Sequence, residues 1–406
     1  MTNFARFAGA AGFALALAGA ALAASFENPP VFQASALLGA NAQGPGYKVE
    51  ETVGSDGYLR IYNVQTPWGI VAVHGDQMMN MRIKEIHALD AMDKTANSKE
   101  FGDALVRAGL KPVEFAGNLV THPVDTVKNT VTGVGKLFGS IGSGIRNAGK
   151  SQDNVVESVT GAAKERRLIA YNYGIDPYTD LPPLKDKLDQ MSRAAAAGGL
   201  AVTGAFILIP GAAGTIISNV SGAQSLNEMI RDDSPAQLMD INRAALRKAG
   251  VSTGLAEKLL TNPNYTPTDM TAFAGALGSM GKLANIDVLI ARAAAATNRD
   301  TAFFMRRNAE LMSARQTALG DITGFVSLPN MPMPIATSRD NGLIAVFALD
   351  ILAWTKDNQE SITALSAAAR SQGMTGPYVL SITGTTTPLA KQQLLALGWD
   401  VEQAVQ

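Results

Sequence analysis

Cysteine is absent from this chain of 406 residues, which excludes disulfides and a lipid-modified cysteine anchor. Histidine is scarce: only His74, His87 and His122 occur, too few and too scattered to indicate a zinc site. Charged residues make up 17% of the chain, below the roughly one quarter of typical soluble domains. The formal net charge of −1 provides no bulk attraction to polyanions, so we do not expect a nucleic-acid partner.

The amino-terminal residues have the pattern of a secretory signal peptide. One positive charge at Arg6 precedes the apolar stretch 7–22, and Ala21-Leu22-Ala23 matches the small-x-small site of a signal peptidase. An uncleaved anchor is the alternative, but the apolar stretch is shorter than the about 20 residues of a membrane span. We therefore expect cleavage after residue 23 or 24 and a periplasmic or secreted protein, with membrane association left open.

The remaining pattern predicts a mainly α protein with a smaller α/β (α+β) part. Strand-like alternation occurs at 58–64 and 70–73, on either side of a turn. Helix starts resembling capping boxes occur at Ser234-Pro235 and Thr266-Pro267. Buried-strand patterns at 342–349 and 377–383 alternate with helical stretches near the end of the chain. The expected organisation is a signal peptide (1–23), an extended linker (24–52), a β-hairpin (53–75), an Ala/Gly-rich helical domain (76–321) and a small α/β domain (322–406), whose sheet the hairpin could join.

An amphipathic stretch at 124–145 suggests contact with an apolar surface. Its apolar residues are spaced three and four apart, as on one face of a helix. Five glycines interrupt it, and each costs about 0.8–1 kcal/mol of helix propensity relative to alanine. The stretch therefore needs a partner, which could be the protein core, another helix or a bilayer surface. The residues expected to make this contact are Val127, Val131, Val134, Phe138 and Ile141.

A second stretch, 194–227, contains no charged residue. Pro210-Gly211 divides it into two arms, each too short to cross about 30 Å of hydrocarbon as a helix. We expect a helical hairpin that is either buried in protein or inserted into one leaflet. Its most apolar residues are Phe206, Ile207, Leu208 and Ile209.

Motifs for catalysis are weak. No G-x-S-x-G nucleophile elbow occurs, so His74 and His122 are low-priority candidates for a catalytic base, although His74 and His87 could meet at the start of one helix. Residues 144–151 match a phosphate-binding loop in letters, but the buried strand that such a loop must follow is missing. Residues 174–183 lack the spacing of a calcium loop and are typical of a joint between two helices. We expect neither a cofactor nor a metal.

Several short motifs resemble those of an uncharacterised family of secreted proteobacterial proteins. They are the segments 59–62 and 66–69, the segment 174–180, and the carboxy-terminal segments 382–385, 387–390 and 397–399. The resemblance covers most of the mature chain. It implies export, and it supplies no activity and no catalytic residues.

Three functions follow as hypotheses. The favoured one is an exported, envelope-associated protein without enzymatic activity, which contacts a membrane surface or a packing partner through 124–145 and 194–227. The second is a periplasmic hydrolase that uses a histidine. The third is a soluble periplasmic scaffold or binding protein, for which the region around His74 and the hairpin is the place to seek a ligand.

Overall fold

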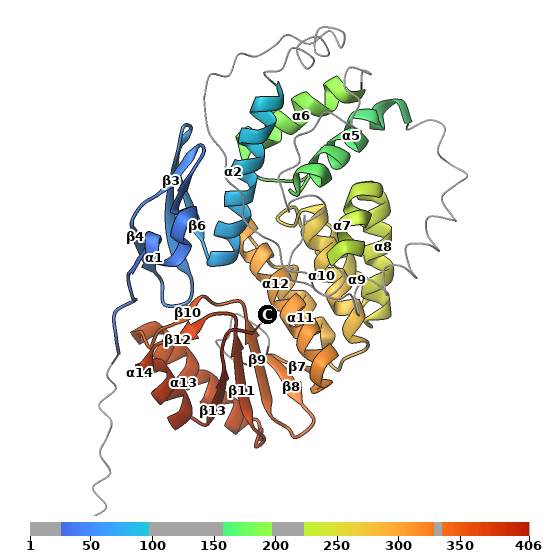
Figure 1. Cartoon of the computed structure of the whole chain (residues 1–406). Coiled ribbons are helices and arrows are strands. Elements are labelled where there is room, and N and C mark those ends of the chain that lie inside the picture. Colours follow the sequence, from blue (N-terminus) through green and yellow to red (C-terminus); the bar gives the residue numbers. More distant parts are fainter. Residues whose placement is uncertain (1–25, 97–156, 197–222, 329–334, 406) are drawn as a thin grey trace, which may run out of the picture.

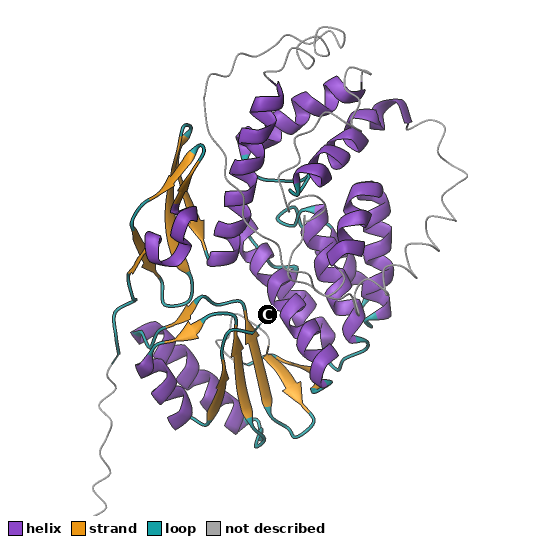
Figure 2. Cartoon of the chain, viewed as in Figure 1, coloured by secondary structure: helices purple, strands orange, loops and turns teal. Residues whose placement is uncertain are grey.

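The computed structural model describes residues 26–96, 157–196, 223–328 and 335–405 (Figure 1). These residues form an amino-terminal sheet, a group of helices and a carboxy-terminal α/β unit, as Figure 2 shows. The predicted class, mainly α with a smaller α/β part, is confirmed. The stretch 124–145, with its five candidate contact residues, lies outside the described residues. So do Phe206 to Ile209 and His122.

The amino-terminal sheet contains more strands than the sequence indicates. Strands β5 (Arg60–Thr66) and β6 (Gly69–His74) form the predicted hairpin, with Thr66 opposite Gly69. The expected linker at 24–52 is wrong for its described part, because short strands there pair into the same sheet. That part holds β1 (Phe32–Gln33), helix α1 (Ala34–Leu38), a 3₁₀ turn (Gly39–Ala42), β2 (Gln43–Gly44), β3 (Tyr47–Val49) and the start of β4 (Thr52–Ser55).

The hairpin does not join the carboxy-terminal sheet. Strand β5 pairs with β3, β4 and β6, so its two edges are already occupied by strands of the amino-terminal part. Backbone and side-chain hydrogen bonds join the two parts instead: the N–H groups of Asp350 and Ile351 both donate to the Tyr58 carbonyl, at 3.0 and 3.2 Å. The carboxylate of Asp350 accepts hydrogen bonds from the backbone N–H groups of Arg60 (2.9 Å) and Asp76 (3.1 Å).

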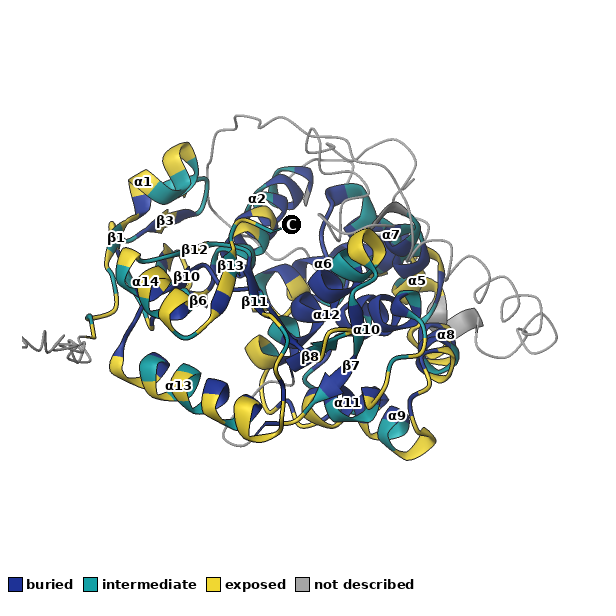
Figure 3. Cartoon of the chain, turned by 90° about the horizontal axis from the view of Figure 1, so that it is seen from below, coloured by how far each residue is buried: buried dark blue, intermediate teal, exposed yellow. Residues whose placement is uncertain are grey.

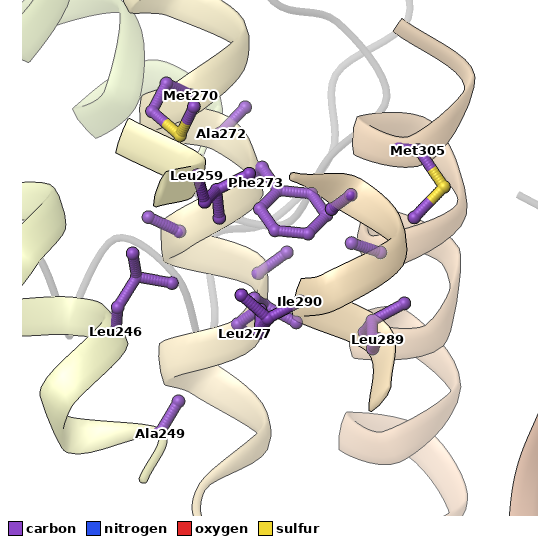
Figure 4. Packing of buried hydrophobic residues seen from close by; sticks show 14 of the residues in the cluster. Leu246, Ala249, Leu259, Met270, Ala272, Phe273, Leu277, Leu289, Ile290 and Met305 are labelled. Carbon is purple, nitrogen blue, oxygen red and sulfur yellow. The ribbon is translucent and has the colours of Figure 1, made fainter. Parts of the chain in front are cut away.

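The helical part surrounds helix α10 (Pro267–Met280), which is buried along nearly its whole length. Phe273 and Leu277 of α10 lie in a core with Leu246, Ile290 and Met305 (Figure 4). Both predicted capping boxes are present, at the starts of α8 and α10. The helices are α2 (Asp76–Ala96), α5 (Glu157–Tyr173), α6 (Pro182–Ala196), α7 (Ala223–Asp232), α8 (Pro235–Lys248), α9 (Thr253–Leu260), α10, α11 (Ile286–Ala293) and α12 (Arg299–Leu319).

The carboxy-terminal unit is a sheet covered by helices on both faces. The strand order is β13-β11-β9-β8-β7, in which β9, β11 and β13 are parallel and the β7–β8–β9 pairings are antiparallel. Alternate side chains of β9 point to opposite faces: Ile344 and Val346 lie in the core around α10 to α12, whereas Leu343 and Ala345 lie in the core with α13 and α14. The elements are β7 (Ile322–Val326), β8 (Ile335–Ser338), β9 (Leu343–Phe347), β10 (Ile351–Leu352), α13 (Lys356–Ser371), β11 (Tyr378–Ile382), β12 (Thr385–Thr386), α14 (Pro388–Ala396) and β13 (Trp399–Glu402).

Helix α13 buries one side and exposes the other (Figure 3). Within the described ranges, none of the helices combines the length and apolar character needed to cross a bilayer. The two described ends of the 194–227 stretch are anchored in the protein, because Ala194 at the end of α6 and Leu226 in α7 are buried.

Candidate functional site

An apolar cavity of about 410 Å³ lies between the carboxy-terminal sheet and helix α13. Its walls come from strands β9, β11 and β13, from the segment after β9 that includes β10, from helices α12, α13 and α14, and from the turn before β5. Almost every wall residue is aliphatic or aromatic, so the cavity provides a continuous apolar surface. The apolar wall residues are Leu59, Phe304, Ala345, Phe347, Leu349, Leu352, Ile362, Leu365, Leu380, Leu394 and Trp399.

Trp399 is held rigidly in this wall. Its indole N–H donates a hydrogen bond to the Ser366 hydroxyl (2.9 Å), and its ring lies 5.3 Å from the Tyr378 ring between centroids. The side chain is nearly completely buried. Because its only polar atom is satisfied, Trp399 presents carbon atoms to the cavity.

Polar side chains gather at the rim of the cavity. Asp56 and Tyr58 come from the turn between β4 and β5, His74 ends β6, and Asp300 and Thr301 begin α12. The rim lies where β9 ends, and ligands of open α/β sheets bind outside the carboxyl ends of parallel strands. The β4–β5 turn, the end of β6 and the start of α12 therefore surround the opening of the apolar cavity.

His74 lies at this rim but has no nucleophile beside it. Its Nδ1 atom is 3.2 Å from the Asp300 carboxylate, and both side chains are about half exposed. Neither Ser361 nor Thr301, which also line the cavity, is hydrogen-bonded to His74 in the described part of the chain. The arrangement orients an imidazole and does not by itself assemble a catalytic triad.

The expectation that His74 and His87 meet is wrong. His87 lies eleven residues into α2, about 16 Å from the start of the helix at 1.5 Å per residue. Its ring contacts Tyr47 instead, with centroids 5.6 Å apart. Burial lowers the pKa of His87, which favours the neutral form.

A narrow space of about 40 Å³, the neck, adjoins the apolar cavity. It shares Leu59, His74, Asp300 and Phe304 with that cavity, and Asp350 forms part of its wall. Burial and the neighbouring Asp76 carboxylate raise the pKa of Asp350 to about 7.

Beyond the neck lies a second cavity of about 110 Å³, the charged cavity. Its walls come from α2, the joint between α5 and α6, the start of α10, and α12. The joint is where the sequence predicts it, since α5 ends at Tyr173 and α6 begins at Pro182. The ionisable residues in its walls are Lys84, Glu85, Asp176, Asp269, Arg306, Arg307 and Glu310.

Most carboxylates of the charged cavity are already paired. Glu85 accepts hydrogen bonds from Arg82 (2.7 Å) and from the Thr179 hydroxyl (2.5 Å). Because Glu85 is fully buried, desolvation outweighs these partners and raises its pKa to about 7. Asp269 pairs with Arg299, while Asp176 accepts from the Thr268 hydroxyl (2.7 Å) and the Tyr178 N–H (2.9 Å).

Sequence reasoning missed this cluster because its members are far apart in the chain. The one local signal is the spacing of Phe303, Arg306, Arg307 and Glu310, which places two arginines and a glutamate on one face of a helix. Within the described residues, no group of three or more His, Asp or Glu side chains is placed to hold a metal ion.

The chain was compared with protein-family models, curated proteins and solved structures, and no significant match was found in any of the three.

Proposed function

We propose that this chain is an exported binding protein for a small, mainly apolar molecule, which occupies the cavity between the carboxy-terminal sheet and α13. The observation that carries the proposal is the size and lining of that cavity. Its volume of about 410 Å³ falls within the roughly 300–1,000 Å³ of small-molecule sites, which are mostly apolar with a few polar groups.

The distribution of polarity also supports a ligand site. The deep walls are leucine, alanine and tryptophan, and the polar residues are confined to the rim. A ligand that covers such walls gains about 25 cal/mol for each Å² of apolar surface removed from water. His74, Asp300 and Asp56 at the rim then orient the polar end of the ligand.

The test uses the mature protein and the fluorescent probe N-phenyl-1-naphthylamine, whose emission rises in apolar surroundings. We expect saturable binding to the wild-type protein. In the variant Ala345→Leu the added side chain fills part of the cavity, so binding should weaken at least about tenfold. Val346 lies on the opposite face of the same strand, so Val346→Leu is the matched control and should bind normally. Failure of the wild type to bind, or equal binding by both variants, would refute the proposal.

A histidine-dependent hydrolase is the second candidate, favoured by the contact between His74 and Asp300 at the rim. The test is hydrolysis of p-nitrophenyl butyrate by wild-type protein and by His74→Ala. Activity that is present in the wild type and lost in the variant would favour the hydrolase. Absence of activity, or equal activity in both proteins, would exclude this role for His74.

Contact with a membrane is a separate proposal that rests on the sequence pattern of 124–145 and 194–227. The test is cell fractionation followed by alkaline carbonate extraction of the membranes. Retention of the mature chain in the membrane after extraction would support insertion. Its release with the soluble periplasmic fraction would contradict membrane contact and leave the binding protein as the simpler function.

A further inference from the structure

Two helices present matching stripes of side chains to the charged cavity. Helix α2 contributes Gln77, Asn80, Met81 and Lys84, and α12 contributes Phe303, Arg306, Arg307 and Glu310. Both sets follow the spacing i, i+3, i+4, i+7, which places each set on one helix face. The cavity is therefore built between two regular helix faces, with the α5–α6 joint and the start of α10 closing its other sides.

Two buried ionic groups in these walls retain an unsatisfied atom. Glu310 is 2% exposed and Arg306 is 8% exposed. One Glu310 oxygen (Oε2) accepts from Arg307 at 3.0 Å. The other, Oε1, and the Nε atom of Arg306 have no hydrogen-bond partner among the described residues. Arg306 Nη1 approaches Glu310 Oε1 to 3.6 Å, and Arg306 Nε approaches Asp269 Oδ1 to 3.4 Å. These contacts are ion pairs, but they leave Glu310 Oε1 and Arg306 Nε without a hydrogen bond.

The mouth of the cavity carries a further unmatched cation. Lys84 and Asn80 on α2 are exposed, and neither makes an ion pair or hydrogen bond with another described residue. The carboxylates Glu85, Asp176 and Asp269 already have the partners given above. The groups left for a ligand are thus one acceptor on Glu310 and donors on Arg306 and Lys84.

We infer that the charged cavity binds a small zwitterion with the size and charges of a free amino acid. Its ammonium group would donate to Glu310, and its carboxylate would accept from Arg306 and Lys84. A purely anionic ligand would leave Glu310 Oε1 without a hydrogen-bond donor, and a purely cationic ligand would leave Arg306 Nε without an acceptor. A zwitterion supplies both groups, so the cost of an unmatched buried polar atom selects for it.

The volume restricts the ligand to small members of this class. At about 110 Å³ the space is well below that of a drug-sized site, roughly 300–1,000 Å³. Glycine, alanine and serine are therefore the probes of choice. This site is distinct from the apolar cavity, and the inference stands whether or not naphthylamine binds there.

Isothermal titration calorimetry of the mature protein tests the inference. We expect at least one of glycine, alanine and serine to bind. Acetate carries only the carboxylate of an amino acid and methylammonium only its ammonium group, so each should bind at least about tenfold more weakly. Lys84→Gln should weaken amino-acid binding about tenfold, because it removes one charge-assisted hydrogen bond at an exposed position. Glu310→Gln removes the negative charge proposed to pair with the ammonium group of the ligand, so this variant should not bind the amino acids.

Lys248→Gln provides the matched control, since Lys248 is an exposed lysine of α8 that does not line the cavity. It should bind as the wild type does. Because Glu310 is buried and its variant could fold poorly, the Lys84 variant carries the test on its own. The inference is overturned if none of the three amino acids binds, if acetate binds as tightly as they do, or if Lys84→Gln and Lys248→Gln behave alike.

Discussion

The pH dependence of stability should report directly on Glu85. This carboxyl group is 2% exposed, and it joins α2 to the α5–α6 joint through Arg82 and Thr179. The charged groups around it are Arg82, Asp180 and Asp176. Asp180 and Asp176 oppose its ionisation and Arg82 favours it, but desolvation is the largest effect.

The magnitude follows from the two pKa values. The pKa of Glu85 rises from its ordinary value of 4.5 to about 7 in the folded protein. Each pKa unit corresponds to about 1.4 kcal/mol, so ionisation of Glu85 should cost the folded state about 3 kcal/mol. Because the folded state binds this proton more tightly, the stabilisation is complete below pH 4.5 and is lost as the pH rises through about 7.

Urea denaturation of the wild type and of Glu85→Gln at pH 5, 6.5 and 8 measures this contribution. The neutral amide resembles the protonated acid, and part of the effect is already lost at pH 5, so the variant should gain about 2.5 kcal/mol relative to the wild type between pH 5 and pH 8. Other titrating groups are present in both proteins and cancel in the difference. Glu257 of α9 is partly exposed, and its hydrogen bond with Arg243 lowers its pKa, so Glu257→Gln should show no such gain. A difference that is constant with pH, or that changes in favour of the wild type, would refute the reasoning.

Three further predictions concern stability and can be measured by the same denaturation assay. Thr266→Ala removes the cap of α10, whose hydroxyl accepts from the Asp269 N–H at 3.0 Å, and should cost about 1 kcal/mol; no loss would argue against the cap. Phe273→Ala empties a fully buried position in the helical core and should cost about 3–5 kcal/mol; a much smaller loss would mean that this core repacks. A Cβ atom at Gly384 would lie 1.9 Å from the backbone oxygen of Asp350, so Gly384→Ala should prevent normal folding. Gly254→Ala in α9, where the added atom meets nothing within 4 Å, is its control and should be neutral or stabilising.

The parts of the fold that the sequence predicts are those with local signals. The capping boxes at Ser234 and Thr266 predict two helix starts because the bonds that form them span only three residues. The buried strands β9 and β11 are predicted for a similar reason, since β9 is a continuous apolar run and only Ser381 interrupts the apolar residues of β11.

The amino-terminal strands and the charged cavity could not be predicted in this way. Strands β1 to β3 have two or three residues each, too few to establish an alternating pattern. Glu85 meets Thr179 across 94 positions of sequence, and nothing near either residue indicates the other. The position of His74 near an opening was expected, but its partner Asp300 lies on a helix more than 200 residues later.

Helix α12 explains why the three spaces occur together. Phe304 lines both the apolar cavity and the neck, and Phe303 and Arg307 line both the neck and the charged cavity. Successive residues of a helix point about 100° apart, so Phe303 and Phe304 face different neighbours while moving as one rigid element. The opposite side of α12 is fixed by the core around α10 and by the sheet, through residues such as Met305 and Met312. The helix therefore holds an apolar site and a charged site at a constant separation, and any displacement of α12 would alter both sites at once.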